Sequence, residues 1–320
     1  MCGIAGIVDL RGRREIDRPA LQRMSAALVH RGPDDEGLWT EPGIGLASRR
    51  LSIVGLADGR QPIFNEDESI AVVFNGELFD FPERRAELIT RGHAFRTSCD
   101  TELLVHLWEE HGEGLLAHLR GQFAFALWDR RRRTLLLARD RMGICPLYWS
   151  RQGDWLYFAS EIKGLLASGK VPAAVDLRGI DHAFTFFAMP SGRTAFQSIS
   201  SLSPAHQLKL DLADNAEPPA LAEKAYWDLE FPDRGEELDP DDSSNLVDEF
   251  RETFRRAVEI RLRADVPVVS YLSSGIDSAA VLAVTSQLRD APVPSFTIQL
   301  DSPGLDESDR AVQIAQGMGR

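Results

Sequence analysis

The first nine residues constrain this chain more than any other stretch. They run Met1-Cys2-Gly3-Ile4-Ala5-Gly6-Ile7-Val8-Asp9, so a cysteine at position two precedes a short apolar segment. An apolar run of this length predicts a buried strand. A buried strand would fix the N-terminus within a sheet, whereas most chain ends fray. We therefore expect the fold to be built around its own first residues.

Cys2 also offers specific chemistry. An initiator methionine is normally removed when the next residue is small, so the mature chain would begin with Cys2 and its free α-amine. An α-amine has an ordinary pKa of about 7.7–8.0, so it can serve as general base for a neighbouring nucleophile. A nearby ammonium also makes a thiol easier to ionise. From this stretch alone two interpretations stay open: Cys2 is a nucleophile, or it is an ordinary residue near the terminus.

Composition narrows the class of protein. The 320 residues suffice for two domains, and a hydrophobic content of 43% supports sizeable cores. The net charge of −13 disfavours a nucleic-acid partner, because phosphate binding needs a basic surface. Three cysteines argue against a disulfide framework and fit a reducing cytoplasm. No apolar run approaches the length of a membrane span, so we expect no membrane partner. The seven histidines show no metal-ligand spacing, and we interpret His106, His111 and His118 as surface or hydrogen-bonded residues.

Residues 1–212 alternate irregularly between strand and helix patterns. Helical spacing predicts helices over 19–29, 83–91 and 101–111, and apolar runs predict strands over 45–54, 70–74, 123–128, 135–138, 147–149 and 155–158. Because the helices do not alternate regularly with the strands, we expect a layered α+β domain in which strands pack on strands. Residues 213–242 are acidic and rich in proline, and we interpret them as a linker.

Residues 243–320 have a regular α/β pattern. We expect a helix beginning at Ser243 or Ser244, a buried strand over 268–272, a helix from 276 or 277 to about 288, a strand over 295–300 and a helix over 306–318. This order predicts a parallel sheet, which needs both faces covered and usually has more strands. We therefore expect that the chain is part of a longer protein or that a partner completes the sheet.

The loop Leu272-Ser273-Ser274-Gly275-Ile276-Asp277-Ser278 lies between a predicted strand and a predicted helix. Small residues let the backbone approach an anion, and the start of a helix supplies amide donors. The alternative is a tight turn in which serine caps the helix. The position favours a pyrophosphate site, because ligands bind at the carboxyl ends of the strands in such sheets.

Six short motifs in order resemble those of class II glutamine amidotransferase domains. They are Cys2-Gly3-Ile4-Ala5-Gly6, His30-Arg31-Gly32-Pro33-Asp34, Arg50-Leu51-Ser52-Ile53, Asn75-Gly76-Glu77, Asp100-Thr101-Glu102 and Arg139-Asp140…Gly143…Pro146-Leu147-Tyr148. With the linker and the serine-rich loop, nearly the whole chain resembles the glutamine-hydrolysing asparagine synthetase family. The family fold implies an α/β/β/α N-terminal nucleophile hydrolase sandwich followed by an ATP-pyrophosphatase-type α/β domain that is incomplete here.

The resemblance implies a role for each motif of the first domain. Cys2 would attack the side-chain amide of glutamine, and its α-amine would pass the proton to the leaving ammonia. The Asn75 amide and the Gly76 N–H would form an oxyanion hole. Glutamine itself would be held by Arg50 at its carboxylate, whose planar fork suits that group, by Glu77 and Asp100 at its ammonium, and by the backbone of Leu51 and Ile53.

In the second domain the resemblance implies an ATP site. The residues that would hold ATP are Leu272, Ser273, Ser274, Gly275, Asp277, Ser278 and Ile298, with Asp277 also contacting Mg²⁺. This ligase half would adenylate a carboxylate, by default that of aspartate, and ammonia would then give an amide, AMP and pyrophosphate in asparagine biosynthesis. Family members are often dimers.

The chain departs from the family pattern at Ser274, where glycine is usual, and at Ser98-Cys99, where Gly-Ser is common. A side chain at position 274 restricts the backbone. The family's later elements, which contact pyrophosphate and the acceptor, lie beyond residue 320. Two alternatives therefore remain: a stand-alone glutaminase or amidase with a vestigial nucleotide lobe, and a non-catalytic binding partner.

Overall fold

The computed structural model describes residues 1–212, 219–236, 243–302 and 304–318. The chain divides into two compact units, residues 1–230 and residues 231–320. Parts of the predicted linker, residues 213–218 and 237–242, lie outside the described residues. The described part of that linker contributes the strand β12 (Glu223–Ala225) to the first unit. The boundaries 1–212, 213–242 and 243–320 stay predictions.

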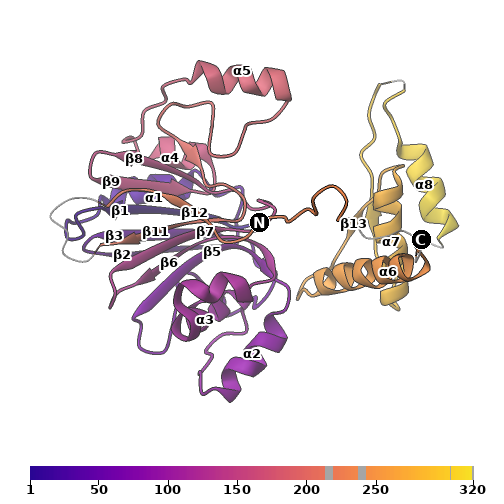
Figure 1. The fold of residues 1–320 in the computed structure, drawn as a ribbon, viewed down its shortest axis with the longest axis horizontal. Coiled ribbons are helices and arrows are strands. Elements are labelled where there is room, and N and C mark those ends of the chain that lie inside the picture. Colours follow the sequence, from indigo (N-terminus) through magenta and orange to yellow (C-terminus); the bar gives the residue numbers. More distant parts are fainter. Residues whose placement is uncertain (213–218, 237–242, 303, 319–320) are drawn as a thin grey trace. The chain divides into compact units, whose positions relative to one another are not determined.

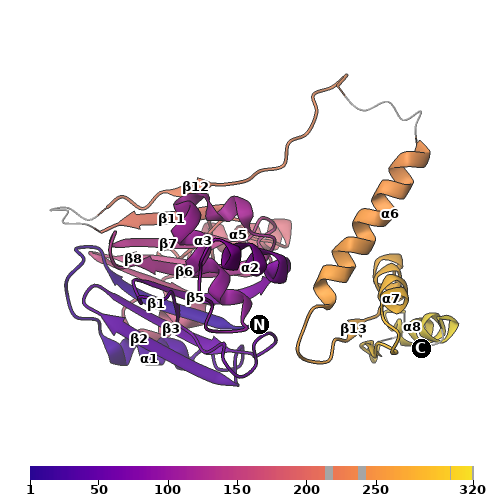
Figure 2. The same ribbon diagram turned by 90° about the horizontal axis from the view of Figure 1, so that it is seen from below.

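The first unit contains two stacked sheets, which Figures 1 and 2 show from two directions. Among the described residues each sheet has six strands, all antiparallel to their neighbours. The first has the order β10 (Ser200–Ser201), β8 (Tyr148–Gln152), β9 (Trp155–Ala159), β1 (Gly3–Asp9), β3 (Ile44–Arg50), β2 (Asp35–Glu41). The second has the order β12, β11 (His206–Asp211), β7 (Thr134–Arg139), β6 (Gly121–Asp129), β5 (Ile70–Leu78), β4 (Ile63–Phe64).

The core of the first unit lies between these sheets, and two further cores lie on their outer faces. Along β1, Ile4 and Val8 pack in the inter-sheet core, whereas Ala5 and Ile7 pack on the opposite face. Both faces of β1 are therefore buried, which explains why the sequence of this strand is an unbroken apolar run. The first residues form the expected strand, and it lies inside a sheet.

Helices cover the outer faces of both sheets. Helices α1 (Arg18–Ala26) and α4 (Ile162–Ala167) pack on the first sheet, while α3 (Leu103–His111) packs on the second with α2 (Phe81–Thr90) beside it. The remaining elements of this unit are the 3-10 helices η1 (Asp100–Glu102) and η2 (Gly112–His118) and the helix α5 (Leu177–Phe186). The order helix, sheet, sheet, helix confirms the predicted α/β/β/α sandwich.

Two strand boundaries differ from the sequence-based expectation, and both differences involve predicted site residues. The stretch over 45–54, interpreted as a strand with its exit, is strand only as far as Arg50. Strand β5 continues through Leu78, so Asn75, Gly76 and Glu77 belong to the strand instead of following it. The pairing of β5 with β6 along its whole length explains the extension, because a neighbouring strand holds polar residues in a ladder that their own propensity would not predict.

The second unit is described by itself. Its elements are α6 (Ser243–Glu259), η4 (Ile260–Leu262), β13 (Ser270–Tyr271), α7 (Ile276–Leu288), β14 (Ser295–Phe296) and α8 (Ser308–Gly317). Strands β13 and β14 pair in parallel, as the pattern predicted. The prediction of a buried strand over 268–272 was wrong in extent and burial, because Val269 is 45% and Tyr271 is 76% exposed.

Among the described residues, no helix combines the length and the apolar character that crossing a bilayer requires.

Candidate active site

A pocket of about 510 Å³, including its open mouth, lies where β1, β3 and β5 end near one another. Seven of the residues predicted to act on glutamine line it: Cys2, Arg50, Leu51, Ile53, Gly76, Glu77 and Asp100. They come from the chain terminus, from the end of β3 and the segment after it, from β5 and from η1. The fold therefore brings together four stretches that are far apart in the sequence.

The Cys2 thiol faces the backbone of the segment that follows β3. The Leu51 N–H donates to Cys2 Sγ at 3.4 Å, and the thiol in turn lies 3.6 Å from the Leu51 carbonyl oxygen. Burial raises the pKa of the Cys2 thiol above its ordinary value, although the Leu51 N–H and the nearby chain-terminal ammonium lower it. The thiol is therefore protonated near neutral pH, and it needs a base before it can attack a carbonyl carbon.

Side chains of neighbouring segments anchor the terminus at Cys2 and at Ile4. Arg31 Nε donates to the Cys2 carbonyl oxygen at 2.8 Å, and the same guanidinium pairs with Glu161 at 3.0 Å. Two residues after Cys2, the Ile4 N–H donates to Ser160 Oγ at 2.9 Å. These contacts assign a positioning role to Arg31, a residue of the second sequence motif.

Arg50 presents a buried cation at the pocket. Its side chain is 5% exposed, and Nη2 donates to the carbonyl oxygens of Val54 at 2.8 Å and Gly55 at 2.7 Å. These carbonyls are neutral, so they orient the guanidinium without cancelling its charge. A bound carboxylate would supply the missing negative charge.

Asp100 presents the opposite charge in the same pocket. It is 4% exposed, and the Leu78 N–H donates to its Oδ2 at 2.8 Å. Burial raises the pKa of Asp100, while hydrogen bonds from Leu78 and Cys99 and the charge of Arg50 lower it. A cationic group in the pocket would favour the ionised form of this carboxyl.

Asn75 is fully buried, yet neither its side-chain nitrogen nor its side-chain oxygen has a hydrogen-bond partner. Along β5, Ala71 and Val73 point into the inter-sheet core, and by the same alternation Asn75 points there too. Cys2 continues the inward-facing series of Ile4 and Val8 from the other sheet. Both side chains therefore face the space between the sheets. Unlike the other predicted residues, Asn75 is not among those that line the pocket, and its amide stays unpaired beside it.

Gly76 lies next to Asn75 in close contact with the neighbouring strand. A Cβ at this position would lie 2.1 Å from the carbonyl oxygen of Gln122 and 2.7 Å from the Cα of Phe123. Only a residue without a side chain fits between β5 and β6 here. The glycine thus brings the β5 backbone to the wall of the pocket.

The sequence motifs missed several lining residues, which include Val54, Gln61, Phe74 and Gln122. Gln61 has the clearest structural role, because its Oε1 accepts from the Phe74 N–H at 2.7 Å and from Ser48 Oγ at 3.2 Å. It therefore ties β3 to β5 beneath the pocket. It lies in an irregular loop, and no periodic pattern in the sequence could have indicated it.

In the second unit, the predicted phosphate loop is closed by its own hydrogen bonds. Ser278 Oγ accepts from the Ser273 N–H at 3.1 Å and lies 2.9 Å from Ser273 Oγ, which accepts from the Gly275 N–H at 3.1 Å. The Ser274 N–H donates to the Glu307 carboxylate at 3.2 Å. An amide of this loop thus already binds a negatively charged oxygen, which is the chemistry that a phosphate requires.

The other residues predicted to bind ATP lie with this loop at one edge of the parallel sheet. Leu272 directly follows β13, and its N–H donates to the Phe296 carbonyl oxygen in β14 at 2.8 Å. Ile298 follows β14 and is 72% exposed. Asp277 is in the first turn of α7 with an exposed side chain. These positions form the carboxyl edge of β13 and β14, where α/β sheets bind ligands.

Solved structures with this architecture define the class of fold. The chain aligns with a glutamine phosphoribosylpyrophosphate amidotransferase from B. subtilis, complexed with ADP and GMP, at 16% identity and a TM-score of 0.51 over 95% of this chain and 68% of that one. A second structure, described as the allosteric regulatory enzyme of purine biosynthesis, aligns at 18% identity and a TM-score of 0.53. The alignment covers 95% of this chain and 67% of that one. The first unit therefore has the N-terminal nucleophile hydrolase fold of class II glutamine amidotransferases.

Family models make the relationship more specific. The model described as glutamine amidotransferase domain matches residues 1–227, and the model described as asparagine synthase matches residues 249–320. With both models matched in this order, the chain belongs to the glutamine amidotransferase family of the glutamine-hydrolysing asparagine synthetase type.

Curated relatives agree with this assignment. Asparagine synthetase [glutamine-hydrolyzing] 3 of Bacillus subtilis is 34% identical over 98% of this chain and 50% of its own length. Asparagine synthetase [glutamine-hydrolyzing] 2 of the same organism is 37% identical over 96% of this chain and 41% of its own length. These relatives are enzymes of the ligase class. A relative from Penicillium rubens, by contrast, is named amidase chyE, and it is 36% identical over 100% of this chain and 50% of its own length. The chain spans about half the length of the curated relatives that it matches.

Proposed function

We propose that the first unit hydrolyses glutamine to glutamate and ammonia, with Cys2 as the nucleophile. The observation that supports this proposal best is the convergence of a thiol, a buried cation and a buried carboxylate on one pocket, through Cys2, Arg50 and Asp100. The cation and the carboxylate match the two charges of a free amino acid. In this proposal the thiol acts on the side-chain amide of such a ligand.

The proposed reaction begins after removal of Met1, which frees the α-amine of Cys2. Burial lowers the pKa of the α-ammonium at the start of the chain, and similar surroundings would favour a neutral amine on Cys2. That amine accepts the thiol proton as Sγ attacks the amide carbon of glutamine, and it passes the proton to the leaving ammonia. Water then hydrolyses the thioester to glutamate and the free thiol.

Asn75 and Gly76 are proposed to stabilise the tetrahedral intermediate. Negative charge develops on the amide oxygen only when Sγ has attacked, so donors aimed at that position lower the barrier without tightening substrate binding. The Asn75 amide has no hydrogen-bond partner within the protein. It therefore does not have to break an internal hydrogen bond in order to donate to the oxyanion.

The Arg50 guanidinium is proposed to bind the glutamine carboxylate, with Asp100 and Glu77 at the ammonium. The backbones of Leu51 and Ile53 complete the pocket beside the thiol. Because the carbonyls of Val54 and Gly55 already orient the guanidinium, little rotamer entropy remains to be lost on binding.

For the complete protein we propose an ATP-dependent ligase that uses the ammonia to amidate an adenylated carboxylate, by default that of aspartate. The loop of Ser273, Ser274, Gly275 and Ser278 would hold the pyrophosphate of ATP, with the backbones of Leu272 and Ile298 near the base. Asp277 fits a Mg²⁺ ion bound chiefly through phosphate oxygens, because such an ion needs only one or two carboxylates from the protein. When bound, the ion would neutralise phosphate charge.

Glutamate release from glutamine tests the first step directly. We expect Cys2→Ala to lose activity by at least about a thousandfold, since removal of a nucleophile abolishes the covalent route. Cys145→Ala is the matched control, because Cys145 is a fully buried thiol of the inter-sheet core and should leave kcat unchanged apart from effects on stability. Equal glutamate release by Cys2→Ala and the unmodified chain would refute the proposal.

The relative named as an amidase supports a second candidate for the complete protein, namely amide chemistry on another acceptor or on water alone. Both candidates share the Cys2 pocket. Tight binding of ATP by the full-length protein, with AMP formed only when a carboxylate acceptor is present, would favour the ligase over the amidase.

A further inference from the structure

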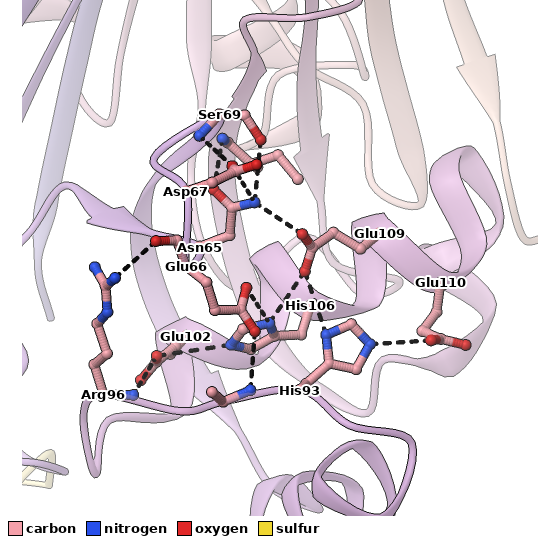
Figure 3. Close-up of polar contacts among 12 residues, drawn as sticks. Asn65, Glu66, Asp67, Ser69, His93, Arg96, Glu102, His106, Glu109 and Glu110 are labelled. Carbon is pink, nitrogen blue, oxygen red and sulfur yellow. Dashed lines mark hydrogen bonds and ion pairs between the residues drawn. The ribbon is translucent and has the colours of Figure 1, made fainter.

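A cluster of imidazoles and carboxylates lies on the outer side of the second sheet, outside the residues assigned to glutamine. Glu66 follows β4, His93 follows α2, and His106 and Glu109 lie three residues apart on α3 (Figure 3). One ligand atom from each of these four side chains lies within 4.8 Å of the others. His106 is fully buried, and the His93 side chain is 12% exposed. We refer to these four residues as the His–Glu cluster.

We propose that the His–Glu cluster binds a divalent transition-metal ion of the zinc type, with Nδ1 of both histidines and one oxygen of each glutamate as ligands. Imidazole nitrogen and carboxylate oxygen are both ligands that Zn²⁺ accepts, usually four of them in a tetrahedron. This inference does not rest on the proposed function.

Three of the six separations between ligand atoms in the cluster are close to those of a tetrahedral site. Bonds of about 2.0–2.1 Å to a tetrahedral ion place neighbouring ligand atoms roughly 3.3 Å apart. Glu109 Oε2 lies 3.2 Å from His106 Nδ1 and 3.3 Å from His93 Nδ1, and Glu66 Oε2 lies 3.7 Å from His106 Nδ1. The other three separations among the ligand atoms are no longer than 4.8 Å, so the four side chains would draw closer together to surround an ion.

The second nitrogen of each imidazole also faces a carboxylate. His93 Nε2 lies 3.0 Å from Glu110 Oε1, and His106 Nε2 lies 3.7 Å from Glu102 Oε1 (Figure 3). Metal-bound histidines characteristically donate their other N–H to a carboxylate, which fixes the tautomer and the orientation of the ring. His93 has this arrangement, whereas His106 Nε2 faces Glu102 at a distance too long for a hydrogen bond.

The two glutamate ligands are oriented in the same manner. Glu109 Oε1 accepts from Asn65 Nδ2 at 2.8 Å, which leaves Oε2 directed at the histidines. Glu66 Oε1 accepts from the Ala94 N–H at 2.9 Å, which leaves Oε2 directed at His106. Three of the four proposed ligands, His93, Glu66 and Glu109, thus have a hydrogen-bonding partner that orients the ligating atom toward the centre of the cluster.

A metal ion explains this pattern better than protons do. Without an ion, Nδ1 of His93 and Nδ1 of His106 both face the same atom, Glu109 Oε2, and the two ring centroids lie 4.9 Å apart. With an ion bound to both Nδ1 atoms, each histidine is neutral and donates only through Nε2–H.

Calorimetric titration of the full chain with Zn²⁺ tests the proposal after removal of metals with a chelator. The titration is made in a Cys2→Ser background, so that the pocket thiol cannot bind the ion. We expect one Zn²⁺ per chain, and in His93→Gln an affinity lower by at least tenfold, because loss of a ligand should cost no less than loss of one of its orienting partners. His93 is chosen because it lies at the edge of the cluster, whereas removing the buried His106 also removes core contacts.

His118→Gln is the matched control, since His118 stacks on His111 at 3.9 Å outside the cluster. It should bind Zn²⁺ as the parent chain does. Substitution by Co²⁺ gives a second readout: the parent should show visible absorption bands typical of tetrahedral nitrogen and oxygen ligands, and His93→Gln should lose them. Equal affinity in the parent and His93→Gln, or the absence of saturable binding in the parent with a native circular dichroism spectrum, would overturn the proposal.

Discussion

Replacing Asn75 by leucine should separate catalysis from stability. The Asn75 side chain is 0% exposed, and both of its polar atoms lack hydrogen-bond partners. A buried polar group without a partner costs roughly 1–3 kcal/mol. Leucine has a similar size, and a shape change in a packed core costs up to about 1.5 kcal/mol. The two effects oppose each other, so Asn75→Leu should change the free energy of unfolding by little, or should increase it.

The rate of glutamate release, unlike the stability, should fall strongly in Asn75→Leu. If the Asn75 amide donates to the oxyanion, its loss should reduce kcat for glutamate release by about 10²–10³-fold, or roughly 2.7–4 kcal/mol of transition-state stabilisation. The KM for glutamine should change little, because the donor acts after Sγ has attacked the amide carbon. Steady-state kinetics of glutamate release and thermal unfolding of the same preparation measure both quantities.

Asn65 provides the matched control. It is also buried, but its Nδ2 donates to Asp67, Ser69 and Glu109, and its Oδ1 accepts from the Ile70 N–H. Asn65→Leu should cost at least about 2 kcal/mol of stability, or roughly 4–8 °C in the unfolding midpoint for a unit of this size, with kcat retained. The reasoning fails if Asn75→Leu keeps kcat within tenfold of the parent, or if it loses as much stability as Asn65→Leu.

Three further substitutions have definite expected outcomes. Gly76→Ala should lower the free energy of unfolding by about 1–3 kcal/mol in denaturant titrations and reduce glutamate release, since its Cβ would lie 2.1 Å from the Gln122 oxygen; an unchanged midpoint would contradict this. Arg50→Lys should raise the KM for glutamine with a smaller effect on kcat, because lysine lacks the planar fork; a KM equal to that of the parent would argue against a carboxylate at this position. Burial raises the pKa of Asp9, but hydrogen bonds dominated by the Arg14 guanidinium lower it to about 2. Its stabilising contribution, about 1–2 kcal/mol, is therefore full above about pH 4 and is lost as pH falls toward 2. Asp9→Asn should be less stable than the parent at pH 7 and equally stable near pH 2, and a difference independent of pH would contradict the assignment.

Much of the first unit could be predicted because its sequence patterns are local. The apolar run after Cys2 predicted a strand, and the structure buries that strand on both faces between a core and a helix layer. Helices α1, α2 and α3 begin and end within a few residues of their expected bounds, because amphipathic periodicity and capping act over a few turns. The hairpin β8–β9 likewise turns at Gly153 and Asp154.

The remaining features depend on long-range pairing, which a single sequence does not encode locally. Strand β5 extends past its predicted end at residue 74 because β6 pairs with it, and that pairing makes Gly76 and Glu77 part of the pocket wall. Gln61 reaches the pocket from an irregular loop. The histidines showed no metal spacing along the chain, yet folding places His93 beside His106 and Glu109. Their ligand atoms converge because two separate segments pack against α3.

The central claim is that the mature N-terminal cysteine forms a covalent bond with glutamine. Intact-mass measurement with peptide mapping, after the reaction is quenched in acid during turnover, tests it most directly. The account predicts a chain without Met1 that carries a glutamyl thioester on Cys2, and no such adduct in Cys2→Ala. Glutamate release by a chain that retains Met1, or an adduct at Cys99 instead of Cys2, would contradict it.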